Sequence, residues 1–257
     1  MSIFHEFLYR PLFNALIALY AFLPGGDLGV AIIVLTVAVR LLLSPLLLRQ
    51  FRSQRALADL QPKVTEIRQS TKDPSEQSRK LLELYRRHGV SPVGGCLPLL
   101  VQLPILWAMY AALQGGLNPD AMSALYPFIP KPEMLDATAF GVVNLAQPAF
   151  QRPGGQFIVS WPAVILAALT VLVTYWQMRL TPTPQSHSPA EDRTPAEQLT
   201  HRMSGQFRFI VPLTTGYFTL ILPAGIALYW FTTTLVAVAQ QWYLLRKVQP
   251  VSSLHGR

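Results

Sequence analysis

Three long stretches of the chain contain no Asp, Glu, Lys or Arg, and they constrain the fold more than any other feature. They run from Arg87 to Asp120, from Arg152 to Arg179 and from Arg208 to Arg246. A helix needs about 20 apolar residues to cross the roughly 30 Å hydrocarbon core of a bilayer. These stretches are too long and too apolar for the core helices of a 257-residue domain. The sequence therefore predicts an all-α integral membrane protein.

The apolar segments and the breaks between them predict five transmembrane helices. The last charge-free stretch is long enough for two short spans, and Leu222-Pro223-Ala224-Gly225 is the natural turn between them. The predicted spans are 28–48, 95–114, 160–180, 208–222 and 224–245. The predicted connections are a polar helical segment at 49–93, an external connection at 115–159, a polar linker at 181–206 and a tail at 246–257.

The segment 49–93 predicts a helical hairpin standing in water. Leu57, Leu60, Val64 and Ile67 form one apolar stripe, and Leu81, Leu82 and Tyr85 form another that can cover it. Asp73-Pro74-Ser75-Glu76 is typical of a helix start, with Asp at the N-cap, Pro at the first helical position and Glu at the third. This second helix stops at Gly89.

Residues 1–24 predict an amphipathic helix at the outer membrane interface. Ser2, Glu6, Arg10 and Asn14 recur every four residues, with apolar side chains between them. A signal peptide is the competing interpretation, but the sequence around Pro24 offers no small-x-small cleavage site.

The distribution of basic residues predicts the orientation. Ten Lys or Arg lie in 49–93, four in 179–208 and three in the tail, whereas the opposite side has only three. Cytoplasmic loops carry the excess of Lys and Arg. The hairpin, the linker and the C-terminus are therefore expected in the cytoplasm, and the N-terminus outside. The same clustering between apolar spans argues against direct nucleic-acid recognition, despite a net charge of +8.

Residue patterns that carry catalysis or bind cofactors are absent from the sequence. The five histidines are scattered through polar segments without metal-ligand spacing, and Cys96 is the only cysteine. No glycine loop of the Walker type occurs. We therefore expect no enzymatic activity, no metal and no cofactor.

Arg40 is the only charged residue near the middle of a predicted span, because Arg179 and Arg208 lie at span ends, and all thirteen acidic residues lie outside the spans. A charge at this depth costs at least a few kcal/mol, so Arg40 should face a water-filled groove. The alternative is that its side chain snorkels to the headgroups, about 12 Å away along the helix. Thr36, Ser44, Gln102 and Gln177 are further candidates to line the groove, because an amide that faces lipid is costly.

Three motifs resemble the YidC/Oxa/Alb family of membrane protein insertases. They are Val34–Arg40 with Pro45, the GGCLPLLVQLPI run at 94–105, and Leu222–Trp230 with Gln240-Gln241 following. The resemblance covers roughly residues 28–246. It implies the short, five-span form of the family, located in a bacterial-type plasma (inner) membrane. It implies a five-helix core around a hydrophilic groove that opens to the cytoplasm and to lipid.

The resemblance also implies site residues and partners. Arg40, Gln177 and Trp230 match the family's groove, and the apolar path of a client helix is expected along Leu103, Pro104, Ile210 and Pro212. Client membrane proteins and the lipid bilayer are the implied partners, and a Sec translocon and the ribosome are further candidates. Insertion without nucleotide hydrolysis is the expected function. An anion or small-molecule transporter that uses Arg40 as its substrate site, and a structural assembly partner, are the alternatives.

Overall fold

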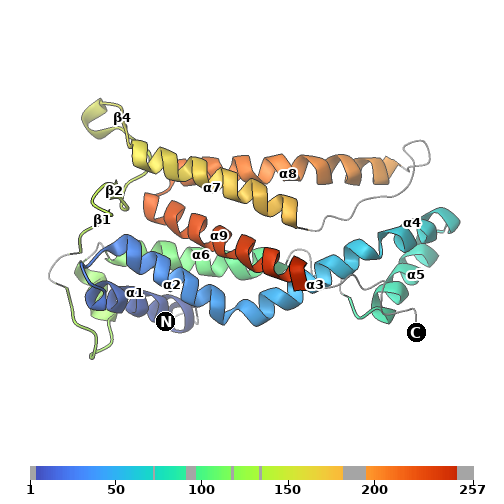
Figure 1. Cartoon of the computed structure of the whole chain (residues 1–257), viewed down its shortest axis with the longest axis horizontal. Helices are drawn as coiled ribbons and strands as arrows, with labels where there is room; N and C mark the ends of the chain where they lie inside the picture. The colour runs from blue at the N-terminus through green and yellow to red at the C-terminus, as the bar shows by residue number, and fades with distance from the viewer. Residues whose placement is uncertain are drawn as a thin grey trace.

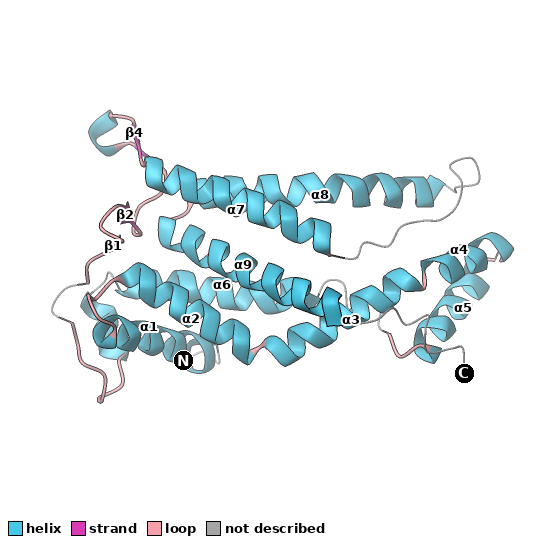
Figure 2. Ribbon diagram, in the orientation of Figure 1, coloured by secondary structure: helices cyan, strands magenta, loops and turns pink. Residues whose placement is uncertain are grey.

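A computed structural model of the chain describes residues 4–71, 73–90, 97–116, 119–132, 135–181 and 195–247, which are mostly helical (Figures 1 and 2). The α-helices are α1 (Arg10–Phe22), α2 (Leu28–Leu42), α3 (Ser44–Asp59), α4 (Gln61–Ser70), α5 (Pro74–Arg87), α6 (Leu97–Gly116), α7 (Trp161–Leu180), α8 (Pro195–Ile221) and α9 (Ala224–Lys247). The shorter elements are η1 (His5–Tyr9), η3 (Pro119–Ala124), η4 (Pro153–Gly155), β1 (Thr138–Ala139), β2 (Val143–Asn144), β3 (Phe150–Gln151) and β4 (Ile158–Val159).

The helix α9 lies at the centre of the bundle. It packs against α2, α6, α7 and α8, while α7 lies against both α8 and α9 (Figure 1). At one end of the bundle, β1 pairs with β2 and β3 pairs with β4 as short antiparallel hairpins. The first of these hairpins contacts α2, α7 and α9. The hairpin of α4 and α5 projects from the opposite end (Figure 1).

The main hydrophobic core lies where α1, α2 and α6 meet the start of α9. Phe13, Ile17, Ile32, Met109 and Ile226 are each at most 1% exposed and belong to one cluster. Burial of such side chains contributes about 1.5–3 kcal/mol each. This end of the bundle is therefore filled with apolar side chains. Polar residues of α2, α6 and α9 lie toward the other end.

The predicted first span, 28–48, is bent rather than straight. The helix α2 ends at Leu42, and α3 starts at Ser44 with a bend of 62° between them. Pro45 lies in the first turn of α3 and has no backbone N–H, so it interrupts the hydrogen-bond ladder of a continuous helix. The second part of the predicted span therefore continues into the segment assigned to the hairpin.

Length and apolar composition single out α7 as a helix that is able to cross a membrane, and the bent pair α2–α3 as a second candidate. No other helix in the described ranges meets these two conditions. The five-span arrangement therefore stays a prediction. Residues 95–96 of the predicted second span, 182–194 of the linker and 248–257 of the tail lie outside the described residues.

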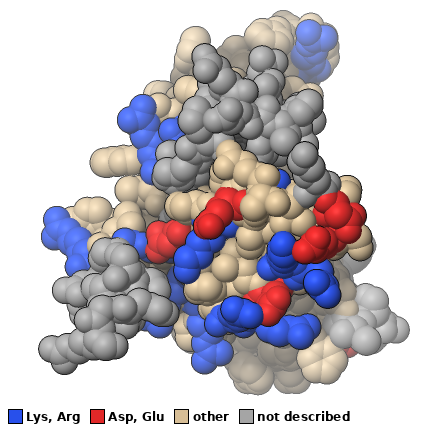
Figure 3. All heavy atoms as spheres, turned by 90° about the vertical axis from the view of Figure 1, so that its right-hand side faces the viewer, with Lys and Arg blue, Asp and Glu red and all other residues tan. Residues whose placement is uncertain are grey.

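The helical hairpin predicted within 49–93 corresponds to α4 and α5, which pack against each other. The predicted cap is confirmed, because the Asp73 carboxylate accepts hydrogen bonds from the backbone N–H groups of Ser75 and Glu76, both at 3.2 Å. Val64 is buried as the predicted stripe requires, whereas Leu82, which the sequence also places in an apolar stripe, is 61% exposed. Seen from this end, Lys and Arg side chains are interspersed with Asp and Glu (Figure 3).

The predicted linker 181–206 is partly helical. Residues 195–206 form the first three turns of α8, which continues without a break into the predicted fourth span. Proline is well suited to the first turn of a helix, and Ala, Glu, Gln and Leu follow Pro195 directly. The polar composition of 195–206 is therefore compatible with a regular helix.

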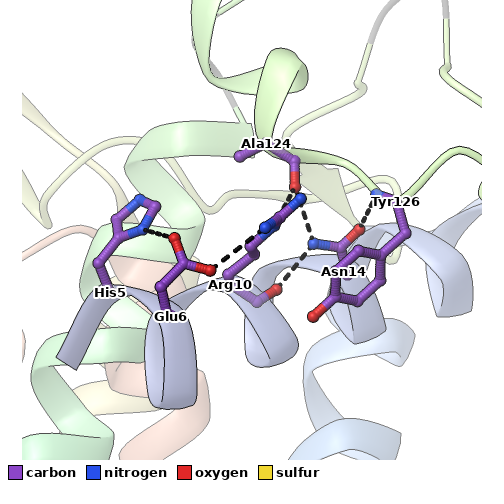
Figure 4. A network of polar contacts seen from close by, with 6 residues as sticks. All are labelled: His5, Glu6, Arg10, Asn14, Ala124 and Tyr126. Carbon is purple, nitrogen blue, oxygen red and sulfur yellow. Dashed lines mark hydrogen bonds and ion pairs between the residues drawn. The ribbon is translucent and has the colours of Figure 1, made fainter. Parts of the chain in front are cut away.

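The polar face of the N-terminal helix packs against the protein instead of facing water alone (Figure 4). Asn14 is 1% exposed, and its Nδ2 donates to the carbonyl oxygen of Ala124 at 3.1 Å. Its Oδ1 accepts from the backbone N–H of Tyr126 at 2.6 Å, and Arg10 Nε donates to Ala124 as well. The four-residue repeat that predicts an interfacial helix thus partly encodes a docking contact with the connection after α6.

Candidate functional site

A polar cavity lies between α2, α3, α6, α7 and α9, next to the main hydrophobic core. It contains about 780 Å³ of empty space, part of which is open to solvent. Its polar lining consists of one arginine, hydroxyl groups and primary amides: Thr36, Arg40, Gln50, Gln54, Gln102, Gln177, Tyr229, Thr233, Gln240 and Gln241. Apolar side chains complete the wall: Val39, Leu43, Leu47, Leu48, Phe51, Ile105, Ala237 and Leu244.

Arg40 enters this cavity from the last turn of α2, directly before the bend. A cation is favourable there because the unpaired carbonyl groups give a helix C-terminus partial negative charge. The Nε of Arg40 donates to the Thr233 hydroxyl of α9 at 2.6 Å. Within the described part of the chain, no Asp or Glu forms an ion pair with Arg40. Its positive charge is therefore held in place but not neutralised.

A second contact joins α6 to α9 beside the arginine. Gln102 Nε2 donates to the Tyr229 hydroxyl at 2.7 Å, and Tyr229 lies four residues before Thr233 on α9. The bonds of Arg40 to Thr233 and of Gln102 to Tyr229 thus join α2 and α6 to adjacent turns of α9. Because these contacts fix the side chains on the cavity wall, the charge is presented from a defined direction.

Several amide atoms on the wall have no protein partner. They are both side-chain polar atoms of Gln50, the Nε2 of Gln240 and the Oε1 of Gln241, all buried and without a hydrogen bond to the described residues. Buried polar atoms are nearly always paired with protein or ordered water. The cavity is therefore built to hold water or a polar ligand.

The structure brings four of the six predicted groove residues together: Thr36, Arg40, Gln102 and Gln177 line the cavity. Ser44 and Trp230 are not among its lining residues. Trp230 is replaced by its neighbour Tyr229, because successive residues of a helix point about 100° apart. Ser44 is the first residue of α3, and its role in a groove stays a prediction.

Three lining residues of α3, namely Gln50, Phe51 and Gln54, fall within the segment assigned to the hairpin. Gln50 and Gln54 are four positions apart, and Leu43, Leu47 and Phe51 recur on the same helical face. This spacing is visible in the sequence. Continued past residue 48, this spacing predicts that the groove-facing side of the first span extends to Gln54.

The four predicted client contacts differ in accessibility. Leu103, Pro104 and Ile210 are exposed, and their apolar side chains are available to lipid or to a client helix. Pro212 is buried and is not accessible to a client.

No group of three His, Cys, Asp or Glu that could hold a metal occurs within the described ranges.

Comparison with known proteins identifies the family. The model of the family described as 60Kd inner membrane protein matches residues 18–251. The membrane protein insertase YidC of Fusobacterium nucleatum subsp. nucleatum is 30% identical over 223 residues, which cover 86% of this chain and 88% of that protein. The insertase YidC of Wolinella succinogenes is 31% identical over 247 residues, which cover 96% of this chain but only 38% of the relative.

A solved structure, described as an active YidC insertase crystal structure with the first transmembrane domain resolved, matches with a TM-score of 0.51 at 26% identity. The match covers 91% of this chain and 46% of the solved one. The helical bundle and these relatives define a bacterial inner-membrane protein concerned with membrane protein biogenesis. The chain belongs to the 60Kd inner membrane protein family, that of the YidC insertases, as the motifs predict.

Proposed function

We propose that this chain inserts transmembrane segments of client proteins into the lipid bilayer, and that the Arg40 cavity receives the client's hydrophilic tail. The insertase names of the relatives support the general function. The observation that carries the finer proposal is the arginine itself. Arg40 faces a cavity lined by neutral amides, and within the described residues no carboxylate compensates its charge.

The proposed mechanism needs no nucleotide hydrolysis. A hydrophilic tail that enters the bilayer alone loses its hydrogen bonds to water, at a cost of several kcal/mol per group. Water and amides in the cavity replace those bonds, and Arg40 attracts acidic residues of the tail where the effective dielectric is lower than in bulk water. The apolar helix of the client meanwhile partitions into lipid and supplies about 25 cal/mol per Å² of buried apolar surface.

We place the cavity toward the cytoplasm, with the N-terminus outside. The helix α3 lines the cavity and leads directly to α4 and α5, so a client arriving at the hairpin reaches the cavity without crossing the apolar core. The apolar core and the strand hairpins lie toward the opposite end. The exposed Leu103, Pro104 and Ile210 are the proposed contacts of the client helix on its way into lipid.

The test is insertion by the purified chain in liposomes, with a short two-span client whose translocated loop is acidic. Protease protection of the loop above that in empty liposomes is the expected result. Arg40→Ala should lower protection about tenfold or more, since a charge-assisted hydrogen bond contributes about 1.5–3 kcal/mol. Arg40→Lys should retain much of the activity because it keeps the charge. The matched control is Arg152→Ala, which removes an exposed arginine of the connection.

The two parts of the proposal fail separately. If the folded chain gives no protection with any client, then autonomous insertion is refuted and the transporter or assembly-partner alternatives gain weight. If protection persists in full with Arg40→Ala, the insertase function stands and the electrostatic role of the arginine does not.

A further inference from the structure

The cavity carries an unusual concentration of one side chain. Six glutamines from four helices line it, and we refer to them as the glutamine set: Gln50 and Gln54 of α3, Gln102 of α6, Gln177 of α7, and Gln240 and Gln241 of α9. Among the cavity's described lining residues, Arg40 carries the only charge, and no Asn, Ser, His, Asp, Glu or Lys is present. Solvation alone does not require this selectivity, because any small polar side chain would hold water.

Gln50 gives the clearest sign of a missing partner. Its side chain is 5% exposed, and neither its amide nitrogen nor its amide oxygen has a hydrogen-bond partner in the described chain. The two atoms of a glutamine amide are assigned by their hydrogen bonds, and exchanging them changes nothing here because both are unpaired. Gln240 adds an unpaired nitrogen and Gln241 an unpaired oxygen. The wall thus presents donors and acceptors together.

A primary amide has the same hydrogen-bonding groups as a peptide bond. An extended polypeptide presents N–H and C=O groups at each residue, and successive residues are about 3.3 Å apart. A glutamine amide can pair with the N–H and C=O of one extended residue, which point to the same side of the chain, whatever side chain that residue carries. Arg40 behaves differently, since a guanidinium only donates and therefore favours anions.

We propose that the glutamine set binds the main-chain peptide groups of the client's hydrophilic tail, independently of its sequence. This inference rests on the proposed function and divides the recognition into two parts. Arg40 selects negative charge, whereas the amides lower the cost of removing the peptide groups from water. Neutral tails are therefore accepted as well as acidic ones.

The experiment uses two synthetic tails of equal length and zero charge. One is a Gly-Ser tail, and in the other every glycine is replaced by sarcosine, whose N-methyl group removes the backbone N–H donor. Each tail is measured as a fluorescent peptide that binds to the full chain in nanodiscs, and as part of a client that is inserted into liposomes. The chain is tested as wild type, as Gln50→Met with Gln240→Met, and as the exposed control Gln156→Met.

In the wild-type chain, the glycine tail should bind roughly threefold to tenfold more tightly than the sarcosine tail, the range for one or two lost hydrogen bonds. The double Gln→Met variant should weaken the glycine tail more than the sarcosine tail, which keeps its carbonyl acceptors, and so reduce this preference, whereas the Gln156→Met control should keep it. Equal affinities of both tails for the wild-type chain would overturn the inference, and this comparison does not depend on the folding of any variant. Equal weakening of both tails by the double variant would overturn it too.

The paired readouts distinguish this inference from the proposed function. A glycine preference in binding without insertion of any client refutes the insertase and leaves main-chain binding in place. Insertion of both clients without any glycine preference refutes main-chain binding and leaves the insertase in place.

Discussion

Asn14 fastens the N-terminal helix to the connection after α6, and its replacement by leucine tests that contact. The variant keeps the side-chain volume but removes the bonds to Ala124 and Tyr126 (Figure 4). Ala124 retains the bond from Arg10 Nε at 3.2 Å, so its carbonyl stays paired. The Tyr126 N–H loses its side-chain acceptor, which costs about 1–3 kcal/mol, and the lost bond to Ala124 adds about 1 kcal/mol.

We therefore expect Asn14→Leu to lower the free energy of local opening of α1 by about 2–4 kcal/mol. In detergent micelles or nanodiscs, hydrogen exchange of the amides in α1 and η3 should accelerate about 30-fold to 1,000-fold, since about 1.4 kcal/mol corresponds to a factor of ten. The matched control is Asn144→Ala, which removes an exposed asparagine with one local bond to Ala146. Its effect should stay below about 1 kcal/mol.

A specific result would refute this reasoning. If Asn14→Leu changes exchange in α1 by less than tenfold, or no more than Asn144→Ala does, then the buried asparagine does not dock the helix. The apolar contacts of Phe13 and Ile17 would then hold α1 by themselves.

Three further predictions concern the bend, the close helix contact and pH. Pro45→Ala should straighten the 62° bend between α2 and α3 by restoring a backbone donor, and spin-label distances across the bend should lengthen; unchanged distances would mean that packing sets the bend. Gly216→Ala would place a Cβ 2.5 Å from Val171 Cγ2, so it should destabilise the α7–α8 contact by about 1–3 kcal/mol in thermal unfolding. Val171→Ala should recover most of this loss, and failure to do so would contradict the steric explanation. The hydrogen bond from Arg10 holds the pKa of the Glu6 carboxyl below its ordinary value of 4.5, so its stabilising contribution is complete above pH 4.5 and is lost as the pH falls through the lowered value. Exchange protection of η1, corrected for intrinsic rates, should fall only in that acidic window, and Glu6→Gln should remove the dependence; a loss near neutral pH would contradict it.

The sequence by itself determined most of the helical segments, although not the start of α8 within the predicted linker, and it indicated that the interior holds a polar, charged side chain. Long charge-free runs and strong local signals such as the Asp73 cap depend on neighbours within a few residues, so they are readable from the chain. The position of Arg40 on a polar cavity was also predictable, because no acidic residue lies in the predicted spans to neutralise it. Trp230, which the family resemblance places in the groove, is not among the lining residues, whereas its neighbour Tyr229 is, because helix packing decides which face of α9 meets the cavity.

Only the tertiary structure decided which side chains meet. Arg40 and Thr233 are 193 positions apart, and Gln102 and Tyr229 are 127 apart, so no local pattern pairs them. The bend before α3 turned Gln50 toward the cavity, although its own segment reads as polar and solvent-exposed. Such contacts arise from how whole helices pack, and packing depends on the combined shape of all their faces rather than on the periodicity of one.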